Sequence, residues 1–113
     1  MPFFGEVFSS EIIKMTVLDP KGEELGRVKD IAIVKGDPLP LVSMLIVEKK
    51  KKCFRLPWND LNIFNKKIIA SKVYREALPP YEYEDSEDDL LVVRDILDKQ
   101  IVDANGAKVV RVN

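Results

Sequence analysis

The sequence predicts a mainly β domain, a small antiparallel barrel of five or six strands that is followed by a short helix and a C-terminal β-hairpin. Within residues 12–71, apolar residues alternate with polar ones in several short segments, which is the period of half-buried strands. Turn-forming residues separate these segments at short intervals, as in barrels and sandwiches. We favour a barrel, because closure removes the exposed edges that so few strands would otherwise leave.

The first two predicted strands span residues 13–19 and 25–35. Between them, Pro20 presets φ at the second position of a turn and Gly22 permits a positive φ. The chain therefore reverses at this point and forms a hairpin.

The next predicted strand, residues 41–47, is an almost continuous apolar run, which indicates that both of its faces are covered. A charged loop at residues 48–52 leads into a strand that ends at Pro57. Residues 58–64 and 67–71 add two shorter strands. The side chains that we expect to be buried are Val17, Val28, Ile31, Ile33, Met44, Ile46, Phe54, Leu56 and Ile69.

Composition changes after the predicted barrel, and this change suggests three parts. Residues 1–76 form the barrel-like domain, residues 77–89 form a proline-rich and acidic linker, and residues 90–113 form a helix with a hairpin. Ser86 is the predicted N-cap of this helix, because Asp89 lies three residues further on, in the position of a capping box. The helix is then expected to run from about residue 87 to 98.

The C-terminal residues 100–112 repeat the pattern of residues 16–28, with Gly106 aligned on Gly22. A lone two-stranded hairpin is marginally stable in water. Either its own barrel or a second chain would cover it, and we favour a second chain in a two-fold contact. The candidate dimer contacts are Ile96, Leu97, Ile101, Val102, Val109, Val110 and Val112.

Two motifs resemble the PRC-barrel domains over residues 12–72. The first is the hairpin of residues 17–30 with its Gly26, Arg27, Val28 and Asp30, and the second is Leu56-Pro57-Trp58. That family includes the cytoplasmic part of the photosynthetic reaction-centre H subunit and the C-terminal domain of a ribosome maturation factor. The resemblance therefore implies a small binding barrel that acts as an adaptor and not as an enzyme.

The residue inventory argues against catalysis. The chain has no histidine, which excludes Ser-His and Cys-His nucleophile pairs and the commonest zinc ligand sets. Its single cysteine, Cys53, is interpreted as a strand residue and fits a reducing compartment. We expect a cytoplasmic protein that is not an enzyme, carries no cofactor and inserts into no membrane.

The favoured function is a non-catalytic protein-binding adaptor or regulatory module, which acts as a homodimer and also binds an unidentified protein. One alternative is an RNA- or ribosome-associated factor that binds through the Lys49–Lys52 loop, although the net charge of −1 gives no general basic excess. Another is a module linked to a divalent metal through the acidic residues 82–89. The candidate partner-binding residues are Lys49, Lys50, Lys51, Lys52 and Arg55.

Overall fold

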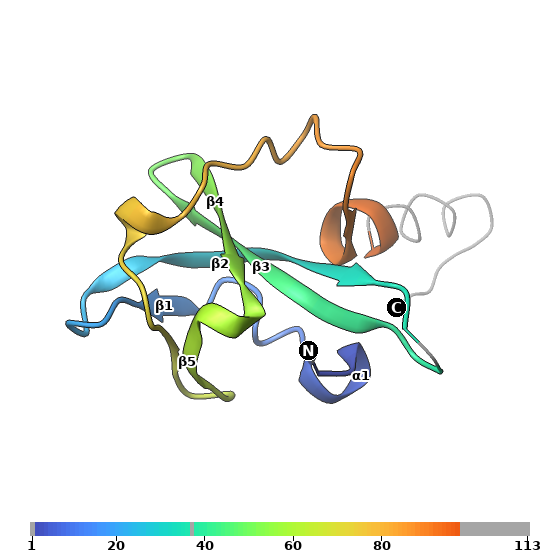
Figure 1. Cartoon of the computed structure of the whole chain (residues 1–113), viewed down its shortest axis with the longest axis horizontal. Helices are drawn as coiled ribbons and strands as arrows, with labels where there is room; N and C mark the ends of the chain where they lie inside the picture. Colours follow the sequence, from blue (N-terminus) through green and yellow to red (C-terminus); the bar gives the residue numbers. More distant parts are fainter. Residues whose placement is uncertain (1, 37, 98–113) are drawn as a thin grey trace.

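The structure is a computed structural model that describes residues 2–36 and 38–97. It contains strands β1 (Thr16–Leu18), β2 (Glu24–Val34), β3 (Leu41–Lys49), β4 (Lys52–Pro57), β5 (Leu61–Phe64), β6 (Ile69–Ser71) and β7 (Leu90–Leu91) (Figure 1). Helix α1 (Phe4–Val7), the 3₁₀ turns η1 (Trp58–Asp60) and η2 (Arg75–Ala77), and the π-helical segment η3 (Val92–Leu97) complete the described elements. The expected mainly β fold is confirmed.

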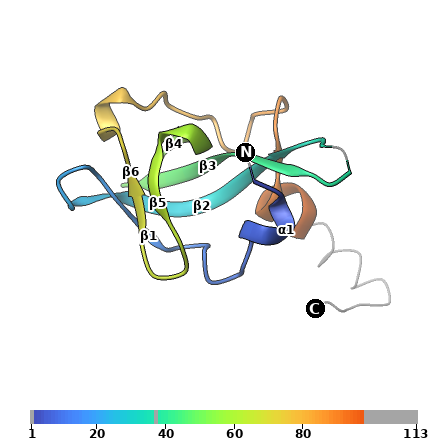
Figure 2. The same cartoon turned by 60° about the horizontal axis from the view of Figure 1, so that its bottom comes forward.

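The strands form one sheet in the order β4-β3-β2-β1-β6-β5, and β7 pairs with β2 outside this path. Strands β4 and β5 stand at the two ends of the order but are consecutive in the chain, so η1 brings the ends of the curled sheet together (Figure 2). The prediction of an all-antiparallel barrel is wrong at one place, because β1 and β6 pair in parallel. These strands are far apart in the sequence, and the β5–β6 hairpin turns β6 into the direction of β1.

Two tight turns form where the sequence predicts them. Asp19 Oδ1 accepts hydrogen bonds from the backbone N–H groups of Lys21 and Glu23 at 2.8 and 3.0 Å, and Gly22 has a φ of 84°. The lysine-rich loop closes the β3–β4 hairpin through Lys50 and Lys51, whose φ values are 52° and 68°. Positive φ at both central positions is the geometry of a type I′ turn, which usually holds Asn-Gly. The two lysines therefore occupy a conformation that costs free energy.

Gly26 allows β2 to lie close to β3. A Cβ atom at this position would lie 2.5 Å from Cγ1 of Val47 and 2.9 Å from the carbonyl oxygen of Glu48. The glycine of the Gly-Arg-Val motif is thus explained by a close backbone approach.

The long strands β2 and β3 are covered on both faces, which the continuous apolar run of residues 41–47 predicts for β3. The larger core cluster lies inside the curled sheet and includes Val17, Leu25, Val28, Ile31, Ile33, Val42, Leu45, Val47, Leu56 and Ile69. The smaller cluster lies on the opposite face of β2 and β3 and consists of Ala32, Met44, Ile46, Tyr81 and Leu91. Of the residues expected to be buried, only Phe54 is half-exposed.

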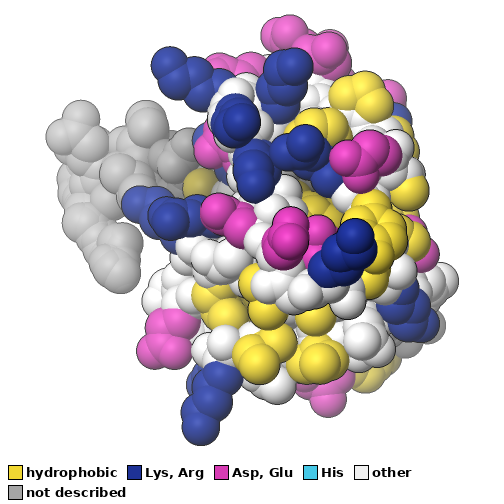
Figure 3. Space-filling model, turned by 90° about the vertical axis from the view of Figure 1, so that its left-hand side faces the viewer, with side chains coloured by type: hydrophobic (Ala, Val, Ile, Leu, Met, Phe, Trp, Pro, Cys, Tyr) yellow, Lys and Arg dark blue, Asp and Glu magenta, His cyan; other side chains and the backbone are white. Residues whose placement is uncertain are grey.

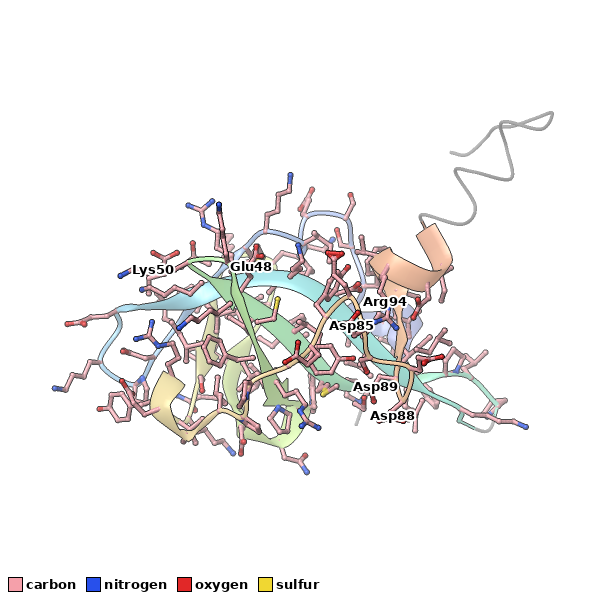
Figure 4. All side chains as sticks on the ribbon, turned by 90° about the horizontal axis from the view of Figure 1, so that it is seen from above. Glu48, Lys50, Asp85, Asp88, Asp89 and Arg94 are labelled. Carbon is pink, nitrogen blue, oxygen red and sulfur yellow. The ribbon has the colours of Figure 1, made fainter. Side chains whose placement is uncertain are left out.

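Residues 78–91, which we call the strap, cover the second face. The strap leaves η2, passes the edge of β4 and crosses above β2 and β3 to reach η3 (Figures 1 and 4). Arg55 N–H donates to the Pro79 carbonyl at 3.0 Å, and Tyr81 N–H donates to the Cys53 carbonyl at 2.9 Å. The strap therefore adds a short antiparallel bridge to the otherwise open edge of β4.

The predicted helix start is wrong. Residues 83–85 form a turn and residues 88–89 a bend, β7 follows, and η3 begins at Val92 instead of residue 87. Ser86 is not an N-cap, because Asp30 of β2 accepts from the N–H groups of Val93 and Arg94 in the first turn of η3, which lie 63 and 64 residues away in the sequence.

Candidate partner-binding site

The five predicted partner-binding residues do not form one uniform patch. Lys50, Lys51 and Lys52 are exposed at the β3–β4 hairpin, which we call the lysine hairpin. The Lys49 ammonium donates to the Glu24 carbonyl at 2.9 Å. The Arg55 guanidinium lies 5.9 Å from the centre of the Tyr81 ring. Within residues 2–36 and 38–97, Lys49 and Arg55 thus already make contacts of this kind, and the structure gives none for Lys50, Lys51 and Lys52.

A pocket of about 410 Å³ opens between the lysine hairpin and the strap. Its aromatic side is made of Phe54, Tyr81 and Tyr83, and Cys53 lies among them. Its charged residues are Lys29, Glu48, Lys51, Lys52, Glu82, Glu84 and Asp85. Figure 4 shows Glu48 and Lys50 at the hairpin and Asp85 on the strap, so two distant parts of the sequence form one site.

The electrostatic character of this pocket is mixed. Lys29 pairs with Glu48 at 3.6 Å, and the strap brings three further carboxylates to the pocket that Lys51 and Lys52 line. Figure 3 shows the same mixture on the end of the molecule, where acidic side chains lie among the lysines and arginines. A continuous basic surface, which nucleic-acid backbones require, is absent from the described residues of this site.

Tyr83 stands between two hollows of the surface. The Lys29 ammonium lies 4.8 Å from the centre of the Tyr83 ring, and the Arg94 guanidinium lies 5.9 Å from it. The ring lines the pocket at the lysine hairpin and also a second pocket of about 480 Å³, which Ile13, Arg27 and Val93 help to line. Because cations flank the ring, its position is defined by attraction as well as by packing.

Asp30 holds the strap and η3 on the barrel. Its side chain is fully buried. Oδ1 accepts from the backbone N–H groups of Ile31 and Val93, both at 2.7 Å, and Oδ2 accepts from Arg94 N–H at 2.9 Å and from the Tyr83 hydroxyl at 2.8 Å. One carboxylate thus caps the start of η3 and fixes the tyrosine that separates the two pockets.

Arg94 completes this anchor. Its guanidinium binds Asp95 through two bonds of 2.8 Å and donates to the carbonyl oxygens of Tyr83 and Asp89. The hydrogen bond to Asp95 raises the pKa of Arg94, against the opposing effect of burial. Asp95 also accepts a hydrogen bond from Leu91 N–H at 2.9 Å. Segment η3 thus donates hydrogen bonds to the strap through Arg94 and accepts one from it through Asp95.

Sequence reasoning missed the role of Asp30. A signal was present, because Asp30 interrupts an apolar strand segment that continues with Ile31 and Ile33. A carboxylate in such a place must be buried with partners or turned to solvent. The sequence does not reveal that its partners lie in residues 83–94.

The predicted dimer contacts fall mostly outside the described residues. This applies to Ile101, Val102, Val109, Val110 and Val112. Ile96 is half-buried and packs against the larger core cluster of its own chain, and Leu97 is the last residue of η3. The contact between chains that the sequence predicts is therefore still a prediction.

The acidic residues of the strap do not form a ligand set. Among the residues that the structure describes, no three cysteine, aspartate, glutamate or histidine side chains gather so that they could hold a metal ion. In the same part of the chain, no helix is long and apolar enough to cross a membrane.

Cys53 is expected to react slowly. Burial and the nearby Glu48 raise the pKa of its thiol, and Lys29 opposes them. Because the thiolate is the nucleophile, alkylation by iodoacetamide should reach half of its maximal rate at a higher pH than for a short cysteine peptide. Glu48→Gln should lower this midpoint pH toward the value for the peptide, because it removes a nearby negative charge. A midpoint at or below that of the peptide would contradict the placement of Cys53.

The curled sheet and its covering strap form a small β-domain that carries a mixed-charge pocket on its surface. The family model of the PRC-barrel domain matches residues 4–77, which is more than half of the chain. The chain belongs to the PRC-barrel family. Neither the comparison with curated proteins nor the comparison with solved structures found a match.

Proposed function

We propose that this chain is a non-catalytic protein-binding adaptor or regulatory module that acts as a homodimer in the cytoplasm. PRC-barrel domains often mediate protein interactions, and this supports the general class. The observation that carries the proposal is the pocket between the lysine hairpin and the strap. Its aromatic side chains and its charges of both signs suit a protein surface that itself carries apolar and charged groups.

The strained turn of the lysine hairpin supports the same site. Lys50 and Lys51 keep positive φ values, although glycine or asparagine would relieve the turn. Strained residues are concentrated at sites that contact ligands. The turn presents exposed lysines beside the aromatic side of the pocket, where an acidic partner residue would gain both kinds of contact.

Affinity capture with matched variants tests the proposal. Lys51→Glu with Lys52→Glu reverses two charges that line the pocket. The control, Lys35→Glu with Lys72→Glu, reverses two exposed charges elsewhere. The wild-type chain and the control should retain the same proteins from a lysate of the source cell. The pocket variant should lose these proteins, whether or not the lysate is treated with ribonuclease.

The other outcomes decide against parts of the proposal. Equal retention of the same proteins by both variants would remove this pocket from the site. Retention that disappears on ribonuclease treatment would favour the RNA alternative. Light scattering on the full chain tests the homodimer separately, and a monomer at all accessible concentrations would exclude it.

A further inference from the structure

The second pocket beside Tyr83, which we call the cationic pocket, carries an excess of positive charge. Lys14, Arg27 and Lys29 line it together with a single carboxylate, Glu48. The pocket between the lysine hairpin and the strap is different, because four carboxylates and three lysines line it. The chain as a whole has a net charge of −1. The cationic pocket is therefore a local site that attracts an anion.

The backbone that carries the three cations is fixed by hydrogen bonds between two segments. Lys14 N–H donates to the Val28 carbonyl at 2.7 Å, and Val28 N–H donates to the Met15 carbonyl at 2.9 Å. These bonds tie the turn before β1 to β2, which carries Arg27 and Lys29. Lys14 also has a φ of 76°, a region that disfavours residues with a side chain, and such strained residues are concentrated at sites that contact ligands. Binding of a ligand thus needs little ordering of this backbone.

The cations of this pocket keep capacity for a further negative charge. Arg27 Nε lies 3.6 Å from Glu24, and Lys29 Nζ lies 3.6 Å from Glu48, so both pairs are longer than hydrogen bonds. Partly exposed pairs of this kind contribute little to stability. Among the described residues, the structure gives Lys14 no ion pair. A carboxylate placed among the three cations would accept charge-assisted hydrogen bonds, which are stronger than neutral ones.

The remaining wall of the cationic pocket is largely apolar. Ile13 and Val93 line it beside the ring of Tyr83, so an aromatic or aliphatic group next to the anion would be removed from water on binding. Beyond this ring, the strap lines the adjoining pocket with three carboxylates. These carboxylates repel a nucleic-acid strand, because its phosphates repeat along its length. A protein segment avoids this repulsion, since it can carry one acidic side chain beside an apolar one.

We propose that the cationic pocket binds an acidic side chain of the partner protein, with an aromatic or aliphatic neighbour of that side chain against Ile13, Val93 and Tyr83. This inference rests on the proposed function and specifies the chemistry of the partner. The ring of Tyr83, whose hydroxyl donates to Asp30, lies between this contact and the pocket at the lysine hairpin. A partner segment that passes over this ring contacts both pockets.

Nuclear magnetic resonance titration of the full-length chain with two peptides tests this proposal. The first peptide is acetyl-Gly-Glu-Phe-Gly-amide, and the second carries glutamine in place of glutamate. The glutamate peptide should shift the backbone amide signals of Lys14, Arg27 and Val93, with a dissociation constant on the order of 1 mM. The glutamine peptide should bind at least about fivefold more weakly, because it lacks the charge that the cations attract. Equal binding of both peptides, or no shift of these signals at about 10 mM peptide, would overturn the proposal.

Matched variants assign the preference to the cationic pocket. Lys14→Gln with Arg27→Gln removes two of its charges, whereas Lys35→Gln with Lys72→Gln removes two exposed charges elsewhere. The preference for the glutamate peptide should disappear in the first variant and persist in the second, and dispersed amide signals should show that both are folded. A preference that persists in the first variant would overturn the site. The wild-type titration decides independently of how either variant folds.

Two further ligands separate the peptide from other anions. Sodium acetate should shift the same signals with a lower affinity, since it has no aromatic neighbour, and equal affinity for acetate would overturn the peptide contact. A short oligouridylate strand should bind more weakly than the glutamate peptide at the same salt concentration. Tighter binding of this strand to the same amides would overturn the choice of a protein partner.

Capture from the lysate separates this inference from the proposed function. If Lys51→Glu with Lys52→Glu loses the retained proteins while Lys14→Gln with Arg27→Gln keeps them, the proposed function stands and the cationic pocket is overturned. The reverse result would overturn the site at the lysine hairpin and leave the cationic pocket. Loss with both variants supports one partner-binding site that spans both pockets, and loss with neither would overturn both proposals.

Discussion

Asp30→Ala is expected to lower the free energy of unfolding by about 3–5 kcal/mol, because it leaves buried donors without their acceptor. The carboxylate is fully buried and accepts bonds from Val93 N–H, Arg94 N–H and the Tyr83 hydroxyl. Alanine would leave these groups unsatisfied beneath the strap. Urea unfolding of the variant and the wild-type chain measures the difference.

Three variants make this prediction specific. Asp30→Asn keeps the size of the side chain but turns an NH₂ group toward N–H or O–H donors, so it should also be strongly destabilising. Tyr83→Phe removes only one of the bonds and should cost about 1–2 kcal/mol. Asp85→Ala removes an exposed carboxylate of the same strap and should cost less than about 0.5 kcal/mol. If Asp30→Ala costs no more than Asp85→Ala, Asp30 does not anchor η3.

Ile46→Ala is expected to cost about 2–5 kcal/mol, because the lost side chain leaves a cavity between the sheet and the strap. Ile46 has no exposed surface and belongs to the cluster that contains Tyr81 and Leu91. Met44, in the same cluster, is 9% exposed, so Met44→Ala should fall in the same range or near its lower end.

Chemical denaturation with an exposed control checks this prediction. Val34→Ala, on the neighbouring strand β2, removes a side chain that is 39% exposed and should cost less than about 1 kcal/mol. Losses below 1 kcal/mol for both Met44→Ala and Ile46→Ala would show that the strap does not bury this face.

Both variants should lose free energy of unfolding because the strap packs on the barrel as part of the folded domain. The PRC-barrel match ends at residue 77, yet Leu78, Tyr81 and Leu91 are buried against the barrel. The strap supplies one wall of the candidate partner-binding site. Variants that loosen the strap should therefore also weaken partner binding, even where they lie outside the pocket.

Local chemistry in the sequence was sufficient for most of the strands and for the two tight turns. It was wrong for residue 13, which lies in a turn before β1, for residues 58–60, which form η1, and for β7, where a helix was expected. Pro20 and Gly22 define the first turn because their allowed φ values restrict the backbone directly. The apolar run of residues 41–47 indicates a strand with two covered faces, and the structure confirms it. The motif around Gly26 identifies the family, and the close approach to Val47 gives the physical reason for the glycine.

Tertiary structure alone decided how these elements meet. The sequence placed a helix start at Ser86 because a capping box is a local pattern, but the cap comes from Asp30 on a distant strand. The parallel pairing of β1 with β6 and the joining of lysines 51 and 52 with the acidic strap likewise depend on segments far apart in the chain. Turn geometry and apolar period act within a few residues, whereas a hydrogen-bond partner or a pocket wall is chosen by the packing of the whole domain.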